Sequence, residues 1–359
     1  MEKVTVGLGE RSYDIVIGGG ILSGIGESMA RFGFSPTVTV ISNPTVFGLY
    51  GNIIMRSLAD AGFRCTSTLV PDGEEYKDYF WSYHILSDLL KNRLDRNCCI
   101  VALGGGVIGD MTGFAASLYM RGIHFVQVPT TLLAQVDSSV GGKTGVNHPA
   151  GKNMIGTFYQ PRLVWTDIST LRTLAKKELL CGMAEIIKYG VIWDAGLFNI
   201  LEEKREMIMD LEPGLISYLV SRSCEIKAEV VSKDERESGL RAILNFGHTI
   251  GHAVETESGY SKYMHGEAVA MGMCAAARLS EALGIMEKAN ADRIESVVSA
   301  YGLPHELPKN VNIDRLLSFI SMDKKAVAGE MKFILPRSIG SVIIQKGVDM
   351  PTLKRTLEL

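Results

Sequence analysis

The chain has 359 residues, of which 46% are hydrophobic and 21% charged, and its formal net charge is −3. This length exceeds what a single core usually supports, so two domains are expected, and the composition is that of an ordinary soluble globular protein rather than a disordered or fibrous one. The near-neutral charge gives no overall attraction to nucleic acid or membrane. Any site for an anion must therefore be a local group of cations.

The amino-terminal residues Met-Glu-Lys-Val-Thr-Val contain no apolar signal core, and we find no run of about 18 apolar residues that could span a membrane. The six cysteines show no Cys-x-x-Cys spacing, and several lie in apolar runs. We therefore expect buried, reduced thiols and a cytoplasmic location.

The first half of the chain alternates short, β-branched apolar runs with helical patterns such as those over 47–61 and 79–93. Strands are predicted over residues 4–8, 13–17, 37–41, 65–70, 98–103 and 125–128. Strand, helix and strand repeated in this way predict a parallel sheet that is covered by helices on both faces.

Beyond about residue 170 the pattern changes to long helical periodicity. The exception is a short hairpin predicted at 332–335 and 341–344. We therefore predict an N-terminal α/β domain over 1–168 and a mainly helical domain over 169–359.

The motif Gly104-Gly-Gly-Val-Ile-Gly-Asp110 directly follows a predicted strand and opens a helical pattern. It satisfies Gly-x-Gly-x-x-Gly, whose glycines let a backbone approach a pyrophosphate at a helix N-terminus. The motif lies several strands into the sheet, however, so a tight turn without a ligand explains it about as well. Two further polar segments, 71–77 and 129–131, also follow strands, and together the three segments favour a nucleotide.

Lys143 and Lys152 lie in glycine-rich segments that are predicted to be loops, and Lys227, Arg241 and the pair 324–325 follow further along. Taken singly, each of these cations is more typical of a solvated surface charge than of a binding site.

Glu185 and Lys188 stand three residues apart within Gly182-Met-Ala-Glu-Ile-Ile-Lys-Tyr-Gly190, an otherwise apolar helical pattern. A carboxylate in such surroundings requires a partner. It is either half of a structural salt bridge or an oxygen ligand that completes a metal site with two histidines, a combination that suits zinc.

Three histidines fall close together at 248, 252 and 265. His248 and His252 are four apart, about 40° around a helix, so they would project from one face, and a break at 258–261 would let His265 return toward them. Such a pair is often surface decoration or a satisfied core pair, but the apolar run 268–277 beside it favours a metal or acid/base site. Spacing alone pairs His248 with His252.

Five of these motifs, in this order along the chain, resemble 3-dehydroquinate synthases. They are Gly104–Asp110, Gly141-Gly-Lys-Thr-Gly-Val-Asn147, Gly151-Lys-Asn153, Ala184-Glu-Ile-Ile-Lys188 and Asn245-Phe-Gly-His-Thr-Ile-Gly-His252. The resemblance covers nearly the whole chain. It implies a Rossmann-like NAD domain, a mainly helical domain for metal and substrate, an active site in the cleft between them, and a homodimer.

The resemblance also implies roles for individual residues. Glu185, His248 and His265 would bind a divalent metal, with Zn²⁺ expected and Co²⁺ as the other candidate, while His252 would face the substrate as a phosphate-contacting or acid/base group. NAD would be bound by Asp72, Gly73, Glu74, Lys77, Gly105, Gly106, Val107, Ile108, Gly109, Asp110, Thr130, Thr131, Asp137, Lys143, Lys152, Thr170, Leu171, Arg172 and Thr173.

Substrate contacts are implied for a further set of polar residues. Lys143 and Lys152 would lie between cofactor and substrate, Arg121 would reach the site of a neighbouring subunit, and one of Lys324 and Lys325 would contact the phosphate. The other substrate-contacting residues would be Asn153, Lys188, Lys227, Arg241 and Asn245.

The reaction that the resemblance implies belongs to the shikimate pathway. It converts 3-deoxy-D-arabino-heptulosonate 7-phosphate into 3-dehydroquinate and phosphate by transient oxidation with NAD, elimination, reduction, ring opening and aldol closure. The alternatives are another sugar-phosphate cyclase, a metal-dependent NAD polyol or polyol-phosphate dehydrogenase, and a binding protein without turnover. Lys227 with Arg241 argues against the dehydrogenase, and the intact set of Glu185, His248 and His265 argues against the binding protein.

Overall fold

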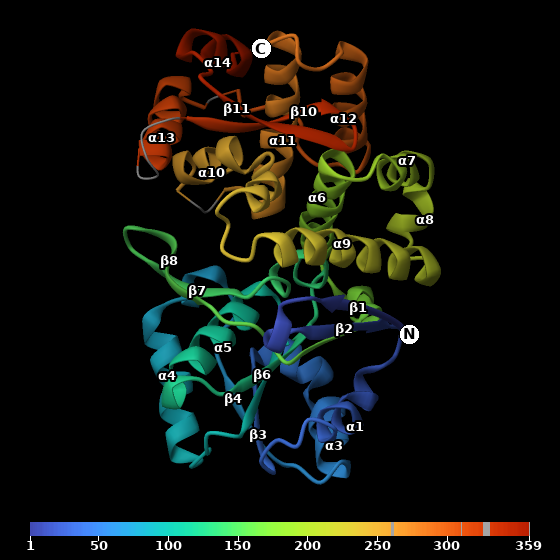
Figure 1. Ribbon diagram of the computed structural model, residues 1–359, viewed down its shortest axis with the longest axis vertical. Coiled ribbons are helices and arrows are strands. Elements are labelled where there is room, and N and C mark those ends of the chain that lie inside the picture. Colours follow the sequence, from blue (N-terminus) through green and yellow to red (C-terminus); the bar gives the residue numbers. More distant parts are fainter. Residues whose placement is uncertain (260–261, 310, 326–330, 359) are drawn as a thin grey trace. The chain divides into compact units, whose positions relative to one another are not determined.

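The computed structural model describes the chain except for residues 260–261, 310, 326–330 and 359 and the side chains of 322–325 (Figure 1). The chain forms two compact units, the first of Met1–Ala175 with Pro213–Ser232 and the second of Lys176–Glu212 with Lys233–Leu359. Helix α9 (Pro213–Lys233) lies within the range predicted for the second domain, yet its contacts group it with the first unit.

The first unit is built on a seven-stranded sheet in the order β1-β2-β9-β6-β5-β3-β4. Its strands are β1 (Glu2–Val6), β2 (Tyr13–Gly18), β3 (Thr37–Ser42), β4 (Arg64–Leu69), β5 (Cys99–Gly104), β6 (His124–Pro129) and β9 (Leu163–Asp167). β1 is antiparallel to β2 and all other pairs are parallel. The predicted parallel sheet is confirmed, and every predicted strand overlaps an observed one. β9 was missed, although Leu-Val-Trp-Thr has the apolar and β-branched character of a strand.

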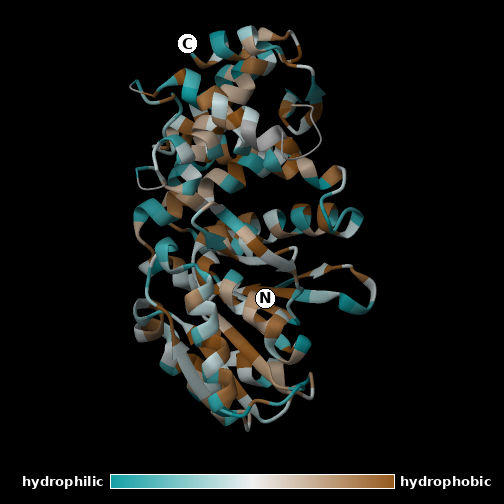
Figure 2. Cartoon of the chain, turned by 90° about the vertical axis from the view of Figure 1, so that its left-hand side faces the viewer, coloured by the Kyte–Doolittle hydropathy of each residue, from teal (hydrophilic) through white to brown (hydrophobic). Residues whose placement is uncertain are grey.

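Helices cover both faces of this sheet (Figure 1). They are α1 (Ile25–Ala30), α2 (Pro44–Val46), α3 (Asn52–Asp60), α4 (Tyr79–Lys91) and α5 (Gly106–Leu118), with short helical turns at Gly9–Arg11, Leu22–Gly24, Phe47–Gly51, Glu74–Tyr76, Tyr119–Arg121, Ala134–Ser138 and Ile168–Thr173. Along β5, Ile100 and Ala102 pack with α4 and α5, whereas Val101 and Leu103 pack with α1 and α3. Because side chains of a strand alternate between faces, a continuous apolar run is what such a strand requires. Figure 2 shows the hydrophobic colour gathered on these strands.

A hairpin of β7 (Lys143–His148) and β8 (Gly151–Phe158) occupies the segments that were predicted to be glycine-rich loops, and that prediction is wrong. The reason is that two of the glycines serve cross-strand packing. A Cβ on Gly156 would lie 2.3 Å from the carbonyl oxygen of Thr144, and one on Gly145 would lie 2.6 Å from that of Ile155. Glycine here marks close approach of two backbones rather than a loop.

The second unit is mainly helical, and its central element is α11 (His265–Ala282). The others are α6 (Lys176–Ile192), α7 (Ala195–Glu203), α8 (Arg205–Met209), α10 (His248–Glu257), α12 (Lys288–Ala300), α13 (Ile313–Lys325), α14 (Met350–Leu357), the turn Leu240–Asn245, and the strands β10 (Lys332–Ser338) and β11 (Ser341–Lys346). α11 packs against α6, α10, α12, α14 and β10. β10 and β11 are antiparallel, which confirms the predicted hairpin.

Helices α10 and α11 cross with their backbones in close contact. A Cβ on Gly272 would lie 2.0 Å from the carbonyl oxygen of Gly247, and one on Gly251 would lie 2.8 Å from that of Ala268. Gly247 itself has a φ of +79°, which favours glycine. With the helices so placed, the ring of His248, at the start of α10, lies 5.3 Å from that of His265, at the start of α11.

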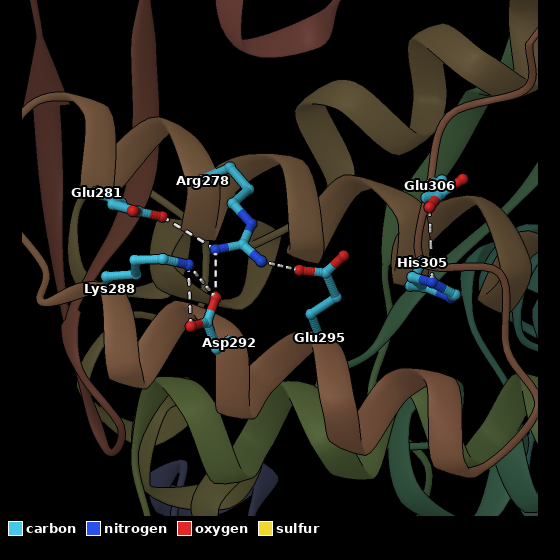
Figure 3. Close-up of polar contacts among 7 residues, drawn as sticks. All are labelled: Arg278, Glu281, Lys288, Asp292, Glu295, His305 and Glu306. Carbon is cyan, nitrogen blue, oxygen red and sulfur yellow. Dashed lines mark hydrogen bonds and ion pairs between the residues drawn. The ribbon is translucent and has the colours of Figure 1, made fainter. Parts of the chain in front are cut away.

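An ion-pair network joins α11 to α12 (Figure 3). The guanidinium of Arg278 donates to Asp292 over 2.7 Å and to Glu281 over 3.0 Å, and it also donates to Glu295. Lys288 donates to Asp292 over 2.9 Å. The same view shows the pairing of His305 with Glu306, whose atoms lie 3.9 Å apart.

In the described part of the chain, no helix is long and apolar enough to cross a membrane. All six cysteines lie in that part as free thiols, and all but the half-buried Cys65 are buried.

Candidate active site

Most of the residues predicted to bind NAD follow the carboxyl ends of strands in the parallel sheet. Asp72–Lys77 follows β4, Gly105–Asp110 follows β5, Thr130 and Thr131 follow β6, and Thr170–Thr173 follows β9. The carboxyl ends of parallel strands share an edge, and ligands of open α/β sheets bind there. The fold therefore brings four separate segments to one place.

The amino terminus of α5 is suited to an anion. Its N-cap residue is Gly105, which has no side chain to occupy the first backbone N–H groups of the helix. A Cβ on Gly105 would lie 3.0 Å from the Cγ2 of Thr131, and one on Gly109 would lie 2.8 Å from the Oε1 of Gln127. The glycines thus let α5 pack closely on β6, as the fingerprint of a nucleotide site requires.

Lys77 links three of the predicted segments. Its Nζ lies 2.6 Å from the Oδ2 of Asp110 and 2.7 Å from the Oδ1 of Asn153, and its side chain is buried. Burial alone would lower the pKa of Lys77, but the carboxylates of Asp110 and Glu74 outweigh it and raise that pKa. Lys77 is therefore a fixed cation that orders the loops around it.

Gln135 is a residue of this edge that sequence reasoning missed. Its buried Nε2 lies 3.3 Å from the carbonyl oxygen of Pro129, 3.1 Å from that of Asp167 and 3.1 Å from the Oγ1 of Thr170. It thereby joins the loop after β6 to the loop after β9. Nothing in its local sequence signals this, because all three partners are distant or main-chain groups.

Other predicted residues of the first unit lie in distinct settings. Lys227, on α9, is buried, and its Nζ lies 2.8 Å from the Oδ1 of Asp137. Lys143 opens β7, and Lys152 and Asn153 lie in β8, where Asn153 has a φ of +54°. Arg121 is exposed and also has a left-handed backbone, with a φ of +69°. Such conformations cost about 1–3 kcal/mol for residues with side chains and are concentrated at functional positions.

In the second unit, the carboxylate of Glu185 is fully buried in α6 and is surrounded by nitrogen atoms. The ammonium of Lys188, one turn along the same helix, is paired with it. The Nε2 atoms of His248 and His265 lie 3.6 Å and 3.7 Å from its Oε1. One ligand atom from each of Glu185, His248 and His265 lies within 4.8 Å of the other two.

The separations within this group match a metal site better than a hydrogen-bonded one. The nitrogen-to-oxygen distances of 3.6 Å and 3.7 Å lie beyond the limit of about 3.5 Å for a hydrogen bond. Ligands of tetrahedral zinc, with bonds of about 2.1 Å, lie about 3.4 Å apart. The donor set of two imidazoles and one carboxylate is also one that zinc accepts in catalytic sites. These three residues therefore fit a divalent metal.

The protonation of His248 suits a ligand. Its Nδ1 lies 3.1 Å from the carbonyl oxygen of Phe246, which can only accept, so Nδ1 carries the proton and Nε2 keeps its lone pair. Burial, helped by the charge of Lys188, lowers the pKa of His248 to about 3. The ring is thus neutral, as metal binding requires.

His265 lies between two carboxylates. Its Nε2 faces Glu185, and its Nδ1 lies 3.5 Å from the Oε2 of Glu255. Burial alone would lower the pKa of His265, but Glu185 and Glu255 outweigh it and raise that pKa to about 9. A metal bound here would take the place of a proton.

A turn before α10 fixes Arg241 and Asn245. Asp234 accepts hydrogen bonds from the backbone N–H groups of Ser238, Gly239 and Arg241. The side chain of Arg241 is buried and donates to the carbonyl oxygen of Glu235. Asn245 donates to the Oε1 of Glu237 over 2.5 Å. The turn thus holds a guanidinium and an amide next to the helix that begins with His248.

Comparisons with known proteins show the family of the chain. Residues 67–181 match the model of the 3-dehydroquinate synthase N-terminal domain, and residues 182–326 match that of the 3-dehydroquinate synthase C-terminal domain. The chain belongs to the 3-dehydroquinate synthase family.

Similar proteins cover the whole length of the chain. A 3-dehydroquinate synthase from Thermodesulfovibrio yellowstonii is 54% identical over 99% of each chain, and one from Nostoc punctiforme is 49% identical over 99% of this chain and 98% of its own. Among solved structures, 2-epi-5-epi-valiolone synthase from Streptomyces hygroscopicus subsp. jinggangensis, with NAD⁺ and Zn²⁺ bound, is 28% identical, with a TM-score of 0.90 and coverage of 98% of this chain and 97% of its own. The predicted family and fold class are confirmed.

Two sequence arguments predict different partners for His248. The family resemblance groups it with Glu185 and His265, and the spacing of the histidines pairs it with His252. However, His252 is exposed and lies outside the group around Glu185. The rings of His248 and His252 are nevertheless only 5.3 Å apart, so His252 lies beside the group. Lys324 and Lys325 end α13, and their side chains lie outside the described residues.

Proposed function

We propose that this protein is a phosphate-eliminating lyase that converts 3-deoxy-D-arabino-heptulosonate 7-phosphate into 3-dehydroquinate and uses NAD and Zn²⁺. The observation that carries the proposal is the convergence of Glu185, His248 and His265 within 4.8 Å in a member of this family. The NAD⁺ and Zn²⁺ bound by the valiolone synthase support the choice of cofactors.

Glu185, His248 and His265 would hold the metal. When bound, it supplies a Lewis acid that stabilises negative charge on substrate oxygens, and NAD supplies a reversible hydride acceptor. Glu185 provides the one anionic ligand, and His248 stays neutral with its Nε2 available. His252, exposed beside this group, is positioned to face a substrate and to contact its phosphate or move a proton.

The cofactor would lie at the carboxyl edge of the sheet. The free N–H groups at the start of α5 would meet its pyrophosphate. Lys77 holds the loops in place through Asp110 and Asn153, and Gln135 does so through Thr170. The residues that we propose to contact NAD remain those predicted from the sequence.

The substrate carries a phosphate and a carboxylate, so its recognition requires fixed cations. Arg241 is suited to the carboxylate, because its guanidinium is buried and donates to the carbonyl oxygen of Glu235, while its backbone N–H donates to Asp234. Lys227 is likewise buried and held by Asp137. Lys143, Lys152, Asn153, Lys188 and Asn245 complete the proposed substrate contacts, with one of Lys324 and Lys325 on the phosphate.

We propose that the protein acts as a homodimer in the cytoplasm. Arg121 is exposed on a left-handed turn, a position from which it can reach a second subunit. The six free cysteines suit a reducing compartment.

The decisive experiment measures phosphate and NADH together. Purified protein with the heptulosonate phosphate, NAD and Zn²⁺ should release inorganic phosphate without net accumulation of NADH, and a chelator should abolish the release. Stoichiometric NADH would instead identify a polyol dehydrogenase. Turnover of another phosphorylated sugar but not of this one would identify a different cyclase.

A further inference from the structure

Glu255 is a buried acidic residue that none of the predicted roles includes. It lies on α10 with only 2% of its surface exposed. A carboxylate buried to this extent is costly unless it is held by a partner. Its Oε2 lies 3.5 Å from the Nδ1 of His265, an ion-pair contact at the outer limit of hydrogen bonding.

The two histidines beside Glu185 share one arrangement. In His248, Nδ1 faces the carbonyl oxygen of Phe246 and Nε2 faces Glu185. In His265, Nδ1 faces Glu255 and Nε2 faces Glu185. Each ring therefore turns Nδ1 toward an acceptor and Nε2 toward the same carboxylate.

This arrangement controls which nitrogen of each ring carries the proton. A neutral imidazole carries one N–H, and an acceptor at Nδ1 keeps that proton there, so Nε2 is left with a lone pair. When the acceptor at Nδ1 is an anion, it also makes the Nε2 lone pair a stronger ligand for a metal, and it fixes the plane of the ring.

We propose that Glu255 is a positioning residue for the metal: it accepts the Nδ1–H of His265 and holds the ring so that Nε2 binds the ion. The inference rests on the proposed metal site of Glu185, His248 and His265. It adds an outer residue that sets the orientation and the strength of one ligand.

An alternative role for Glu255 is that of a ligand in a second metal site. One ligand atom from each of His252, Glu255 and His265 also lies within 4.8 Å of the other two. That site would need both ring nitrogens of His265 to bind metals, and so the loss of its last ring proton. The arrangement around His248, where Nδ1 faces a carbonyl oxygen, favours the hydrogen-bonded role.

The test is a Zn²⁺ titration of metal-free protein against a competing chelator. Glu255→Gln keeps the size of the side chain and removes its charge, and it should weaken Zn²⁺ binding about 10–100-fold while one ion per chain is still bound. Glu255→Asp keeps the charge on a shorter side chain and should restore part of the affinity. Co²⁺ bound to Glu255→Gln should show an altered visible spectrum, because one ligand has changed its orientation.

Glu257→Gln is the matched control. It removes the same charge from the same helix, about 200° away around the axis, and should leave Zn²⁺ affinity unchanged. If Glu255→Gln bound Zn²⁺ as tightly as the unmodified chain and only lowered the midpoint of thermal unfolding, Glu255 would be structural and the proposal overturned. Two ions per unmodified chain and one per Glu255→Gln chain would also overturn it, in favour of the second site.

His248→Ala separates this inference from the proposal on which it rests. Unchanged Zn²⁺ affinity in His248→Ala would show that the metal site itself is wrong. Loss of Zn²⁺ in His248→Ala with full affinity in Glu255→Gln would remove only the role of Glu255.

Discussion

Helix α11 carries charged side chains near both ends, and the two groups differ in what surrounds them. His265 begins the helix beside the fully buried Glu185, whereas Arg278 lies near its end, 29% exposed, among carboxylates that are 27–45% exposed. Arg278 meets Asp292 over 2.7 Å, but the imidazole nitrogens stop 3.6–3.7 Å from Glu185. The groups around Arg278 are joined by direct hydrogen bonds. The wider spacing between the imidazole nitrogens and Glu185 leaves room for an ion.

The largest effect on metal binding is expected when the histidines are removed one at a time. His248→Ala should lose Zn²⁺ affinity by more than about 100-fold, since even outer residues of metal sites account for 10–100-fold. His252→Ala should keep bound metal and lose activity, because its exposed ring lies outside the group around Glu185. Metal content after dialysis, with phosphate release measured on the same samples, checks both. Equal loss of metal in the two variants would contradict the assignment.

The next largest effect should come from the helix crossing that brings the buried group together. In Gly272→Ala the new Cβ would lie 2.0 Å from the carbonyl oxygen of Gly247, so the helices must separate. We expect a loss of unfolding free energy of about 1–3 kcal/mol or more, together with weaker Zn²⁺ binding. Gly48→Ala is the control, since its Cβ would meet nothing within 4 Å. Denaturant unfolding of both variants decides the matter, and equal stability would refute the packing argument.

Asp234 has a partly exposed carboxylate that accepts hydrogen bonds from several backbone N–H groups. The N–H groups of Arg241, Ser238 and Gly239 outweigh the effect of burial and lower its pKa from 3.8 to about 2. A lowered folded-state pKa means that the stabilisation is complete above about pH 4 and is lost as the pH falls toward 2.

We therefore expect Asp234→Asn to cost about 1 kcal/mol of unfolding free energy at neutral pH, a value reduced for solvent screening, and to raise KM for the substrate through Arg241. The stability difference from the unmodified chain should shrink below pH 4. Urea unfolding at several pH values measures it, and a difference independent of pH would exclude the carboxylate as its source.

The smallest effect is expected in the exposed network. Arg278→Met should cost about 1 kcal/mol or less, should matter less at high salt, and should leave Zn²⁺ affinity unchanged. Thermal unfolding at low and high ionic strength tests this. A loss of metal binding in this variant would show that the two groups on α11 are coupled.

Much of the sheet unit could be predicted from the sequence, because its signals are local. Strand β5 is an apolar run, and the motif Gly104–Asp110 begins at its last residue, so strand, turn and helix are all encoded within a short segment. The β7–β8 hairpin was missed for a local reason as well. Gly145 and Gly156 serve backbone packing, but in a sequence they are typical of loops.

The site in the second unit could be predicted only in part. Periodicity placed His248 and His252 on one face of a helix, but the neighbour that matters to His248 comes from α11, across a crossing set by Gly247, Gly251 and Gly272. Such a contact depends on two helices at once and leaves no periodic signal. Glu255 and Gln135 were missed for the same reason, since their partners lie in other elements. Only the family resemblance predicted the grouping of Glu185 with His248 and His265, whose ligand atoms lie within 4.8 Å of one another.

The contacts of α9 bear on the order in which the protein can fold during synthesis. The first unit needs Pro213–Ser232, whose Cys224 thiol donates to the carbonyl oxygen of Gln135 and whose Lys227 meets Asp137. A ribosome releases the chain from its amino end, so this unit cannot close until residue 232 has emerged, after part of the second unit has already been made. A gene fragment that ends at residue 175 would lack this helix, whereas one that joins 1–175 to 213–232 through a linker would encode the complete unit.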